Sequence, residues 1–518
     1  AKGRVDLLLA YGSEKKLWVD EVTTRFNGLG VRLESGKSIH VEARAMGSME
    51  AVEGAGAGRL HAHMISPASG AAFKLANAKS RTSTGRDLVG ETKNLLLSPV
   101  VIAMWRPMAE KLGWPEKPIG WSDVLALAKD DRGWAKYDSP QWGRLKFGHT
   151  HPEYSNSGLI SIIAATYAGA GKQAGLTLED AARPAVREYV GAIEQAVVHY
   201  GESTGFFGRK MFENGPEYLS AAVLYENMVI ESYDRAKYQT SFPVVAIYPK
   251  EGTFWCEHPI GVVEREWVSE EAKEGAQKYI EFLMQPRQQE RGMALGFRPA
   301  DVSIKLGAPV DADHGVDPSE PKTVLETPGA DVIGATVDAW KIVKKKSNVV
   351  LVLDTSGSMK EQNRMENAKS GAAELLAMLG DEDTFSLLTF NDKLTWVQQG
   401  AKLKDQRARA GGYIKSLFPG GGTALYDAVA DAWRKLEASS ERDKISAIVV
   451  LTDGADTDSK LKLESLIALF GSNVERSGTR IFTIGYGGTA KAEILLSLIH
   501  ISEPTRLRRI SYAVFCLK

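Results

Sequence analysis

The chain has 518 residues, of which 25% are charged, and its formal net charge is −1 at pH 7. This balance gives no support for nucleic acid or an anionic membrane surface as a partner, and no apolar run approaches the roughly 18 residues that a membrane-spanning helix needs. Cys256 is the only cysteine before residue 496, so neither a disulfide framework nor a thiolate metal site is expected. The length suggests about three domain-sized units.

The first elements are a strand and a helix joined by a polar turn. Val5 to Ala10 predicts a buried strand, and Trp18, Val22 and Phe26, spaced four residues apart, predict a helix after it. The turn Tyr11 to Glu14 contains a serine that can cap this helix. Free backbone N–H groups at such a turn can bind an anion, although most turns of this kind only cap a helix.

The same pattern recurs twice. The predicted strand His61 to Ser66 ends in Ser66-Pro-Ala-Ser69. The predicted strand Lys146 to Thr150 leads into the polar turn Pro152 to Gly158 and a helix over Leu159 to Gly169. Because the pattern occurs three times, an anion-binding site built from helix N-termini is a stronger hypothesis than a single turn would support.

Three further segments extend the similarity to a known family over residues 4–305. They are Leu95 to Ala103, Tyr225 to Asn227 and Ile247 to Thr253. This region resembles bacterial extracellular solute-binding proteins, in the style of the type II receptors for molybdate-like and phosphate-like oxyanions. The resemblance implies a two-lobed α/β fold. Residues 1–98 and 243–305 are expected to form lobe one and residues 99–242 lobe two, with the solute between them.

Carried over to this sequence, the resemblance implies a set of side chains that hold the solute. Glu226 and Glu251 fall near the expected cleft and would oppose a dianion, so a cationic, zwitterionic or hydroxylated solute is an alternative to an oxyanion. The polar candidates are Ser13, Ser66, Ser69, Ser155, Asn156 and Ser157.

Histidines and tryptophans in this half allow two further hypotheses. His61 with His63, and His149 with His151, each place two imidazoles on one face of a strand, which suits a transition metal. No acidic or cysteine partner has matching spacing, so packing is the favoured interpretation. The tryptophans between Trp105 and Trp142 could stack on a sugar, but their irregular spacing favours the core of lobe two.

Residues 306–346 are expected to form a connector. Its first part is rich in Pro, Gly and Asp. Its second part, Asp331 to Val343, has the apolar spacing of a helix, and Lys344 to Lys346 suit the helix end because cations complement its dipole.

Three polar segments in the last part of the chain predict a metal site. The continuously apolar strand Val349 to Leu353 ends in Asp354-Thr-Ser-Gly-Ser358, and the strand Ile445 to Leu451 ends in Thr452-Asp453-Gly454. Between them, Gly420 to Thr423 opens a helix. The carboxyl ends of parallel strands meet at one edge, so the segments can converge. Two carboxylates and three hydroxyls, without His or Cys, suit Mg²⁺ or Mn²⁺.

These segments resemble the von Willebrand factor A domain, whose metal-ion-dependent adhesion site has the pattern DxSxS, then Thr, then Asp. The resemblance implies a doubly wound, Rossmann-like domain over residues 347–495 and a partner protein that offers a carboxylate to the metal. The alternative interpretation is an Asp/Ser/Gly turn followed by an unrelated Asp-Gly turn. The implied metal-site residues are Asp354, Ser356, Ser358, Thr423 and Asp453.

The final segment, residues 496–518, resembles translated sequencing-adapter read-through. Leu496 to Arg506 and Ile510 to Lys518 carry the resemblance, and the three residues between them fall where a sample index is read. The segment is therefore not expected to contribute to the fold. On this interpretation the A domain is cut after the strand Arg480 to Ile484.

No phosphate loop, HExxH, GxSxG or Cys/His pairing is present, so an enzyme is not expected. The sequence favours an exported bacterial recognition protein that acts in the periplasm or at the cell surface. Export is expected to depend on a signal or anchor upstream of Ala1. One alternative is an importer receptor in which the A domain only scaffolds. Another is a chelatase-like accessory subunit.

Overall fold

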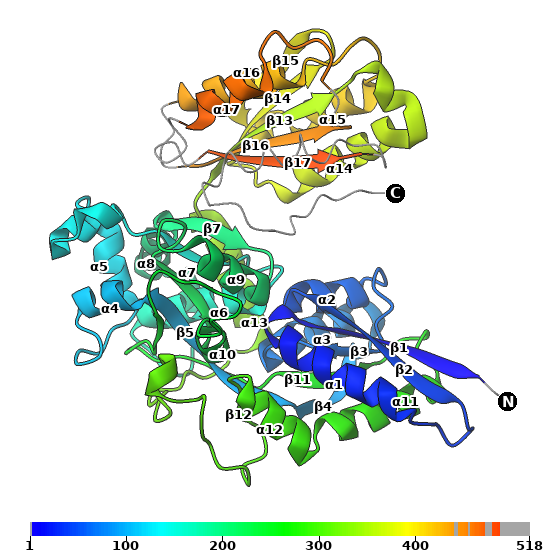
Figure 1. Ribbon diagram of the computed structural model, residues 1–518, viewed down its shortest axis with the longest axis vertical. Coiled ribbons are helices and arrows are strands. Elements are labelled where there is room, and N and C mark those ends of the chain that lie inside the picture. The colour runs from blue at the N-terminus through cyan, green and yellow to red at the C-terminus, as the bar shows by residue number, and fades with distance from the viewer. Residues whose placement is uncertain (1–2, 440–443, 454–455, 472–478, 487–518) are drawn as a thin grey trace. The chain divides into compact units, whose positions relative to one another are not determined.

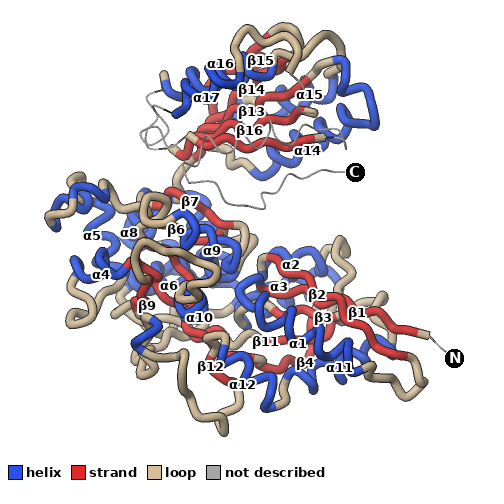
Figure 2. The backbone as a smooth tube through the Cα atoms, in the orientation of Figure 1, coloured by secondary structure: helices blue, strands red, loops and turns tan. Residues whose placement is uncertain are grey.

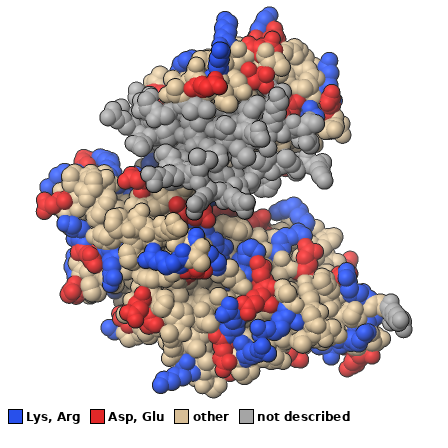
Figure 3. All heavy atoms as spheres, viewed as in Figure 1, with Lys and Arg blue, Asp and Glu red and all other residues tan. Residues whose placement is uncertain are grey.

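The computed structural model describes residues 3–439, 444–453, 456–471 and 479–486. It divides into two compact units, residues 1–344 and 345–518 (Figure 1). Positive and negative side chains are interspersed over the visible face of the first unit (Figure 3). In the described ranges, no helix combines the length and the apolar composition that a bilayer-spanning segment requires.

Lobe one of the first unit is a five-stranded sheet covered by helices (Figure 2). Strand β1 is parallel to both of its neighbours, β2 and β3, and the late strand β11 joins β3 antiparallel. In sheet order the strands are β2 (Ser38–Met46), β1 (Arg4–Gly12), β3 (Met64–Ser66), β11 (Pro259–Val263) and β4 (Val89–Asn94); the helices are α1 (Lys16–Leu29), α2 (Ser48–Gly56), α3 (Gly70–Thr84), α11 (Glu270–Leu283) and α12 (Pro286–Ala294).

Helix α1 shows why the sequence folds as it does here. Trp18, Val22 and Phe26 are all buried in the lobe-one core, so the predicted spacing of four is confirmed. The helix ends at Gly30, whose φ of 62° is left-handed and favours glycine.

Lobe two is a mixed sheet built around the long strand β5. Its strands are β5 (Leu96–Trp105), β6 (Phe147–Thr150), β7 (Val197–Gly201), β8 (Ala221–Tyr225), β9 (Val244–Ile247), β10 (Trp255–Cys256) and β12 (Arg298–Pro299); its helices are α4 (Arg106–Leu112), α5 (Trp121–Lys129), α6 (Asn156–Ala170), α7 (Leu178–Ala182), α8 (Pro184–Gln195), α9 (Thr204–Asn214) and α10 (Glu226–Glu231).

The return from lobe two to lobe one differs from the expected boundary at 242/243. Strand β9 pairs antiparallel with β5, Ile247 opposite Ile102, and therefore belongs to the lobe-two sheet. The chain enters lobe one between Cys256, where β10 ends, and Pro259, where β11 begins. It later touches lobe two again, because β12 also pairs with β5.

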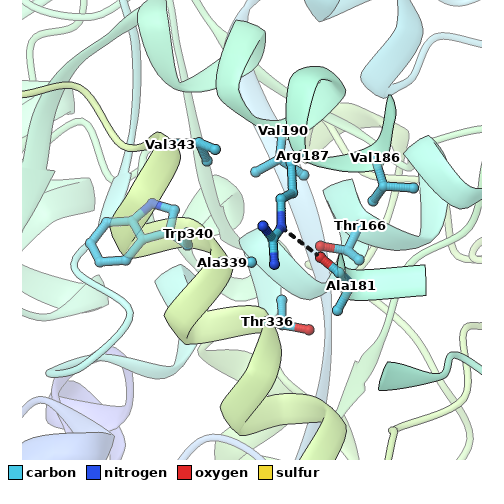
Figure 4. Close-up of a pocket in the computed structure, with 9 residues that line it drawn as sticks. All are labelled: Thr166, Ala181, Val186, Arg187, Val190, Thr336, Ala339, Trp340 and Val343. Atoms are coloured by element: carbon cyan, nitrogen blue, oxygen red, sulfur yellow. Dashed lines mark hydrogen bonds between the residues drawn. The ribbon is translucent and has the colours of Figure 1, made fainter. Parts of the chain in front are cut away.

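The connector helix, α13 (Ala330–Val343), belongs to the first unit. It packs on α6, α7 and α8, and Trp340 is only 1% exposed. Figure 4 shows the narrow gap beside it, about 10 Å³, into which the Arg187 side chain extends. A gap of this size holds about one water, so α13 completes the core of lobe two.

Trp340→Ala is expected to lower the unfolding free energy of the first unit by about 3–5 kcal/mol, because it removes a fully buried indole. Hydrogen–deuterium exchange of peptides from α6 and α8 in the full chain measures this. Ile342, on the same helix but 61% exposed, is the matched control, and Ile342→Ala is expected to change stability by about 0.5 kcal/mol or less. Equal effects of the two variants would contradict the docking of α13.

The second unit is one sheet with helices on both faces. Strand β13 lies at its centre: Val350 and Val352 point into one core, Leu351 and Leu353 into the other, as a continuously apolar strand predicts. In sheet order the strands are β15 (Leu394–Lys402), β14 (Thr384–Phe390), β13 (Ser347–Asp354), β16 (Ile445–Thr452) and β17 (Arg480–Gly485); the helices are α14 (Arg364–Met378), α15 (Arg407–Ser416), α16 (Leu425–Glu437) and α17 (Leu463–Gly471).

The expected doubly wound A-type domain is therefore confirmed for the described residues of the second unit, as is the α/β class of both units. Strand β17 covers the predicted strand Arg480 to Ile484. The segment 496–518 lies outside the described residues, so its interpretation as adapter-derived stays a prediction.

Candidate functional site

The three polar segments of the second unit meet at one edge of the sheet. Strands β13 and β16 are parallel neighbours, with Leu353 opposite Leu451, so the residues that follow them emerge side by side. The Gly420 N–H donates to the Thr355 carbonyl at 2.8 Å, and the Gly357 N–H donates to the Gly421 carbonyl at 2.9 Å. These bonds join the segment after β13 to the loop before α16.

The third segment, which follows β16, is bonded to the loop before α16. The Thr457 N–H donates to the Thr423 carbonyl at 2.9 Å, and the Asp458 carboxylate accepts from the Thr423 N–H at 2.9 Å. A side chain at Gly422 would collide with that carboxylate and would require Asp458 to move away from the Thr423 N–H. The five predicted metal-site residues thus lie on three loops that backbone hydrogen bonds hold together.

Asp354 is the most enclosed member of this group. Its side chain is buried and accepts from the Ser356 N–H at 2.8 Å and from the Thr452 hydroxyl at 2.6 Å. Burial raises the pKa of Asp354, and the nearby Asp453 charge adds to the rise. The Ser356 and Ser358 hydroxyl oxygens, on the segment that follows Asp354, lie 3.0 Å apart. A cation beside these oxygens would offset the charge of Asp354.

Asp453 has one oxygen paired and one oxygen available. Its Oδ2 accepts from Nη1 of Arg364 at 2.9 Å, and both side chains are nearly buried. Its Oδ1 is buried and accepts no hydrogen bond from the described residues. An unsatisfied buried carboxylate oxygen is costly, so a positively charged ligand at this atom would be stabilising.

The residues present therefore fit a divalent metal ion. Two carboxylates and three hydroxyls provide a hard oxygen donor set, and one carboxylate oxygen lacks a partner in the described part of the chain. That part contains no cluster of three or more His, Cys, Asp or Glu side chains, so an ion here would depend on the hydroxyls.

Arg364 was not among the residues predicted for this site. A signal exists: Arg364 is the first residue of α14, where a cation opposes the helix dipole. A cation at that position calls for a carboxylate partner, but the sequence alone does not say which one.

The serine-rich turns of the first unit also come together. The Ser13 hydroxyl donates to the Ser203 hydroxyl at 2.8 Å and accepts from the Gly205 N–H at 2.9 Å. The Ser69 hydroxyl donates to Oδ1 of Asn156 at 2.6 Å. Both contacts join lobe one to lobe two, and all these side chains are buried.

Hydroxyls within lobe two continue this network. The Thr204 hydroxyl lies 3.1 Å from that of Ser155 and 2.9 Å from that of Ser157. Thr150 bonds Ser157 at 2.7 Å. We call Ser13, Ser69, Thr150, Ser155, Asn156, Ser157, Ser203 and Thr204 the interlobe hydroxyl cluster.

Helix N-termini surround this cluster, as predicted, but the protein itself occupies one of them. Ser69, Ser155 and Ser203 are N-cap residues of α3, α6 and α9, and none of their hydroxyls bonds its own helix. The Tyr154 carbonyl of lobe two accepts from the N–H groups of Met49 and Glu50, both at 3.0 Å, at the start of α2 in lobe one. A position that could bind an anion is thus filled by a backbone oxygen.

The other three predicted cleft residues lie outside these contacts. Ser66 is buried, and its hydroxyl has no partner among the described residues. Glu226 is paired with Arg298 at 2.6 Å and accepts from the Tyr248 hydroxyl, so its charge is already balanced. Glu251 accepts from the N–H groups at the start of α5.

A buried ionic group beside the cluster was not predicted. Lys15 donates to Glu14 at 2.7 Å and lies 3.2 Å from Nδ1 of His258, and all three side chains are buried. Burial, together with the Lys15 charge, lowers the pKa of His258 to about 4. Burial would raise the pKa of Glu14, but Lys15 and His258 lower it to about 2. The only sequence signal is a Glu-Lys pair directly after a buried strand.

The histidine pairs have structural roles. His63 accepts from the Leu8 N–H at 3.0 Å, His149 pairs with Glu194 at 2.9 Å, and the rings of His151 and Tyr154 stack. Among the tryptophans, Trp105, Trp121 and Trp134 are buried in the core, as the favoured interpretation predicted.

Comparison with known proteins recognises both parts of the chain. Residues 348–514 match the von Willebrand factor type A domain, and residues 90–318 match the bacterial extracellular solute-binding protein family. Both resemblances drawn from the sequence motifs are confirmed.

Among curated proteins, inter-alpha-trypsin inhibitor heavy chain H4 of Sus scrofa is 29% identical over 125 residues, 23% of this chain and 13% of that protein. The uncharacterized protein sll0103 of Synechocystis is 30% identical over 152 residues, 29% of this chain and 34% of that protein. The chain thus spans a small part of these relatives. The sulfate-binding protein SubI from Mycobacterium tuberculosis H37Rv aligns with a TM-score of 0.38 at 18% identity, over 58% of this chain and 88% of that chain.

Proposed function

We propose that this chain, which joins a bacterial solute-binding module to a von Willebrand factor A domain, is an exported recognition protein. Asp354, Ser356, Ser358, Thr423 and Asp453 hold Mg²⁺ or Mn²⁺, and a protein partner supplies an acidic side chain to the metal. The bound metal would supply a positive charge that attracts this carboxylate.

The unsatisfied oxygen of Asp453 carries this proposal. It is buried, and it lies on one of three loops that are fixed by hydrogen bonds to one another, so little reorganisation is needed to bind a cation. Arg364 holds the other oxygen and orients the carboxylate. The chain's own residues thus position the oxygen atoms and provide the negative charge that a cation would need.

Recognition is a better proposal than catalysis. In the first unit, the hydroxyls of the interlobe cluster bond one another, and His149 and His258 are each engaged with a carboxylate. The match of the first module to an extracellular solute-binding family also supports a location outside the cytoplasm, in the periplasm or at the cell surface.

Water-proton relaxation in the presence of Mn²⁺ tests the metal and the carboxylate together. We expect the full chain to bind Mn²⁺ and to enhance relaxation through metal-bound water. N-acetyl-glutamate amide should lower the enhancement by displacing water, whereas N-acetyl-glutamine amide, which has the same shape without the charge, should not. Absence of Mn²⁺ binding, or equal effects of the two compounds, would refute the proposal.

A further inference from the structure

An exposed aromatic residue lies close to the candidate metal site. Phe418 is 84% exposed, the highest value among the large apolar side chains described in the second unit. Single exposed apolar residues are common on protein surfaces, so exposure alone indicates nothing. The position and the immobilisation of this residue distinguish it.

The chain on both sides of Phe418 is anchored. Leu417 is buried in one core of the A domain, which directs the next side chain outward. Gly420, two residues later, donates to Thr355 at 2.8 Å, and its carbonyl accepts from Asn391 at 3.1 Å. Two residues span about 7 Å at most, so the Phe418 backbone lies within about that distance of the metal-site loops.

Two further features restrict the residue. Phe418 precedes Pro419, which limits its backbone to extended conformations. The ammonium of Lys369 lies 5.6 Å from the centre of the Phe418 ring, a cation–π contact, and is itself held by Glu366 at 2.8 Å. Because the ring is already held, a ligand that covers it loses little conformational entropy on binding.

We propose that Phe418 determines specificity beside the metal site: it contacts an apolar side chain that neighbours the partner's acidic residue. The recognised feature is an acidic peptide segment in which a Glu or Asp has an aliphatic neighbour. This inference rests on the proposed function, because the carboxylate reaches the metal while the neighbour covers the ring.

Three peptides test the inference by calorimetry with the full chain in excess Mg²⁺. They are the amidated, N-acetylated sequences Leu-Glu-Leu, Ala-Glu-Ala and Leu-Gln-Leu. We expect Leu-Glu-Leu to bind about three- to tenfold more tightly than Ala-Glu-Ala, since aliphatic carbons are removed from water. EDTA should abolish binding of both, and Leu-Gln-Leu should bind weakly in either condition.

Two variants separate a specific role from general surface effects. Phe418→Ala is expected to remove the advantage of Leu-Glu-Leu while leaving the affinity for Ala-Glu-Ala unchanged. The matched control is Met378→Ala. Met378 is 62% exposed in the same domain, but it ends helix α14, about 20 Å along the axis from Arg364, and should change neither affinity.

The outcomes distinguish the two proposals. If both Glu peptides bind with Mg²⁺ but equally well, or if Phe418→Ala keeps the preference, the role of Phe418 is wrong and the metal-site function stands. If neither Glu peptide binds more tightly than Leu-Gln-Leu in Mg²⁺, the proposed function itself fails. Thermal melts of both variants in EDTA, expected to match the wild type, exclude misfolding as the cause.

Discussion

Acidification from pH 7 to pH 4 is expected to lower the unfolding free energy of the first unit by about 3 kcal/mol through His258 alone. Burial and the Lys15 charge lower the pKa of His258 from 6.5 to about 4. Between these pH values the unfolded chain binds a proton that the folded chain excludes. The stabilisation is therefore present above pH 6.5 and lost as the pH falls toward 4.

Glu14 acts in the same direction at lower pH. Its pKa is lowered from 4.5 to about 2, because Lys15 and His258 outweigh the opposing effect of burial. Its contribution is present above pH 4.5 and is lost as the pH falls toward 2. Stability should thus decline in two overlapping steps.

His258→Asn isolates the first step. The φ of His258 is 43°, a left-handed value that asparagine tolerates better than most residues. The pH dependence of unfolding, measured by hydrogen–deuterium exchange on peptides of lobe one, should flatten between pH 6.5 and 4 in this variant. His314→Asn, at a partly exposed histidine, is the control and should keep the wild-type slope. An unchanged slope in His258→Asn would show that the buried ionic group does not control acid stability.

Asp354→Asn is expected to have opposite effects on the A domain with and without metal. Without metal, the variant should melt at a higher temperature, because it removes a buried charge whose pKa is raised by burial. The amide can still accept from the Ser356 N–H, and the Thr452 hydroxyl can rotate to accept from the amide. With excess Mg²⁺, the wild type should gain about 3 kcal/mol at 100 times the dissociation constant, and the variant should gain almost nothing.

Melting of the full chain in EDTA and in MgCl₂ measures this crossover. Ser356→Ala is the graded comparison: it removes one neutral ligand, keeps both carboxylates, and should retain part of the Mg²⁺ stabilisation. A wild-type melting temperature that is the same in EDTA, Mg²⁺ and Mn²⁺ would contradict metal binding at this site.

The metal-site loops could be predicted from the sequence because each follows a recognisable apolar strand and because the Asp and Ser residues have a fixed spacing. Continuous apolar runs before Asp354 and before Thr452 place both turns at strand ends, and parallel pairing brings those ends together. Arg364 could not be predicted in the same way. Its contact with Asp453 joins residues 89 positions apart, and no local pattern specifies such a pair.

The predicted solute site shows that the sequence alone is also insufficient where local patterns are read correctly. The turns that carry Ser13, Ser69 and Ser155 were found from local patterns, and they do converge. The hydrogen bonds of these hydroxyls to partners in the other lobe depend on how the two lobes pack. No local sequence pattern specifies that packing. Glu226 illustrates the consequence: it was expected to affect solute charge, but Arg298, 72 residues away, neutralises it.

The contact of the Tyr154 carbonyl with the start of α2 has a consequence for any solute. This carbonyl, with the cross-lobe bonds of Ser13 and Ser69, behaves as a tethered competitor: a ligand of the same chain whose effective concentration is millimolar or higher. A solute that bound at the start of α2 would have to displace this carbonyl, and its apparent affinity would be the intrinsic affinity multiplied by the fraction of molecules with the lobes apart. Only a compound that replaces several of these bonds at once would overcome that competition.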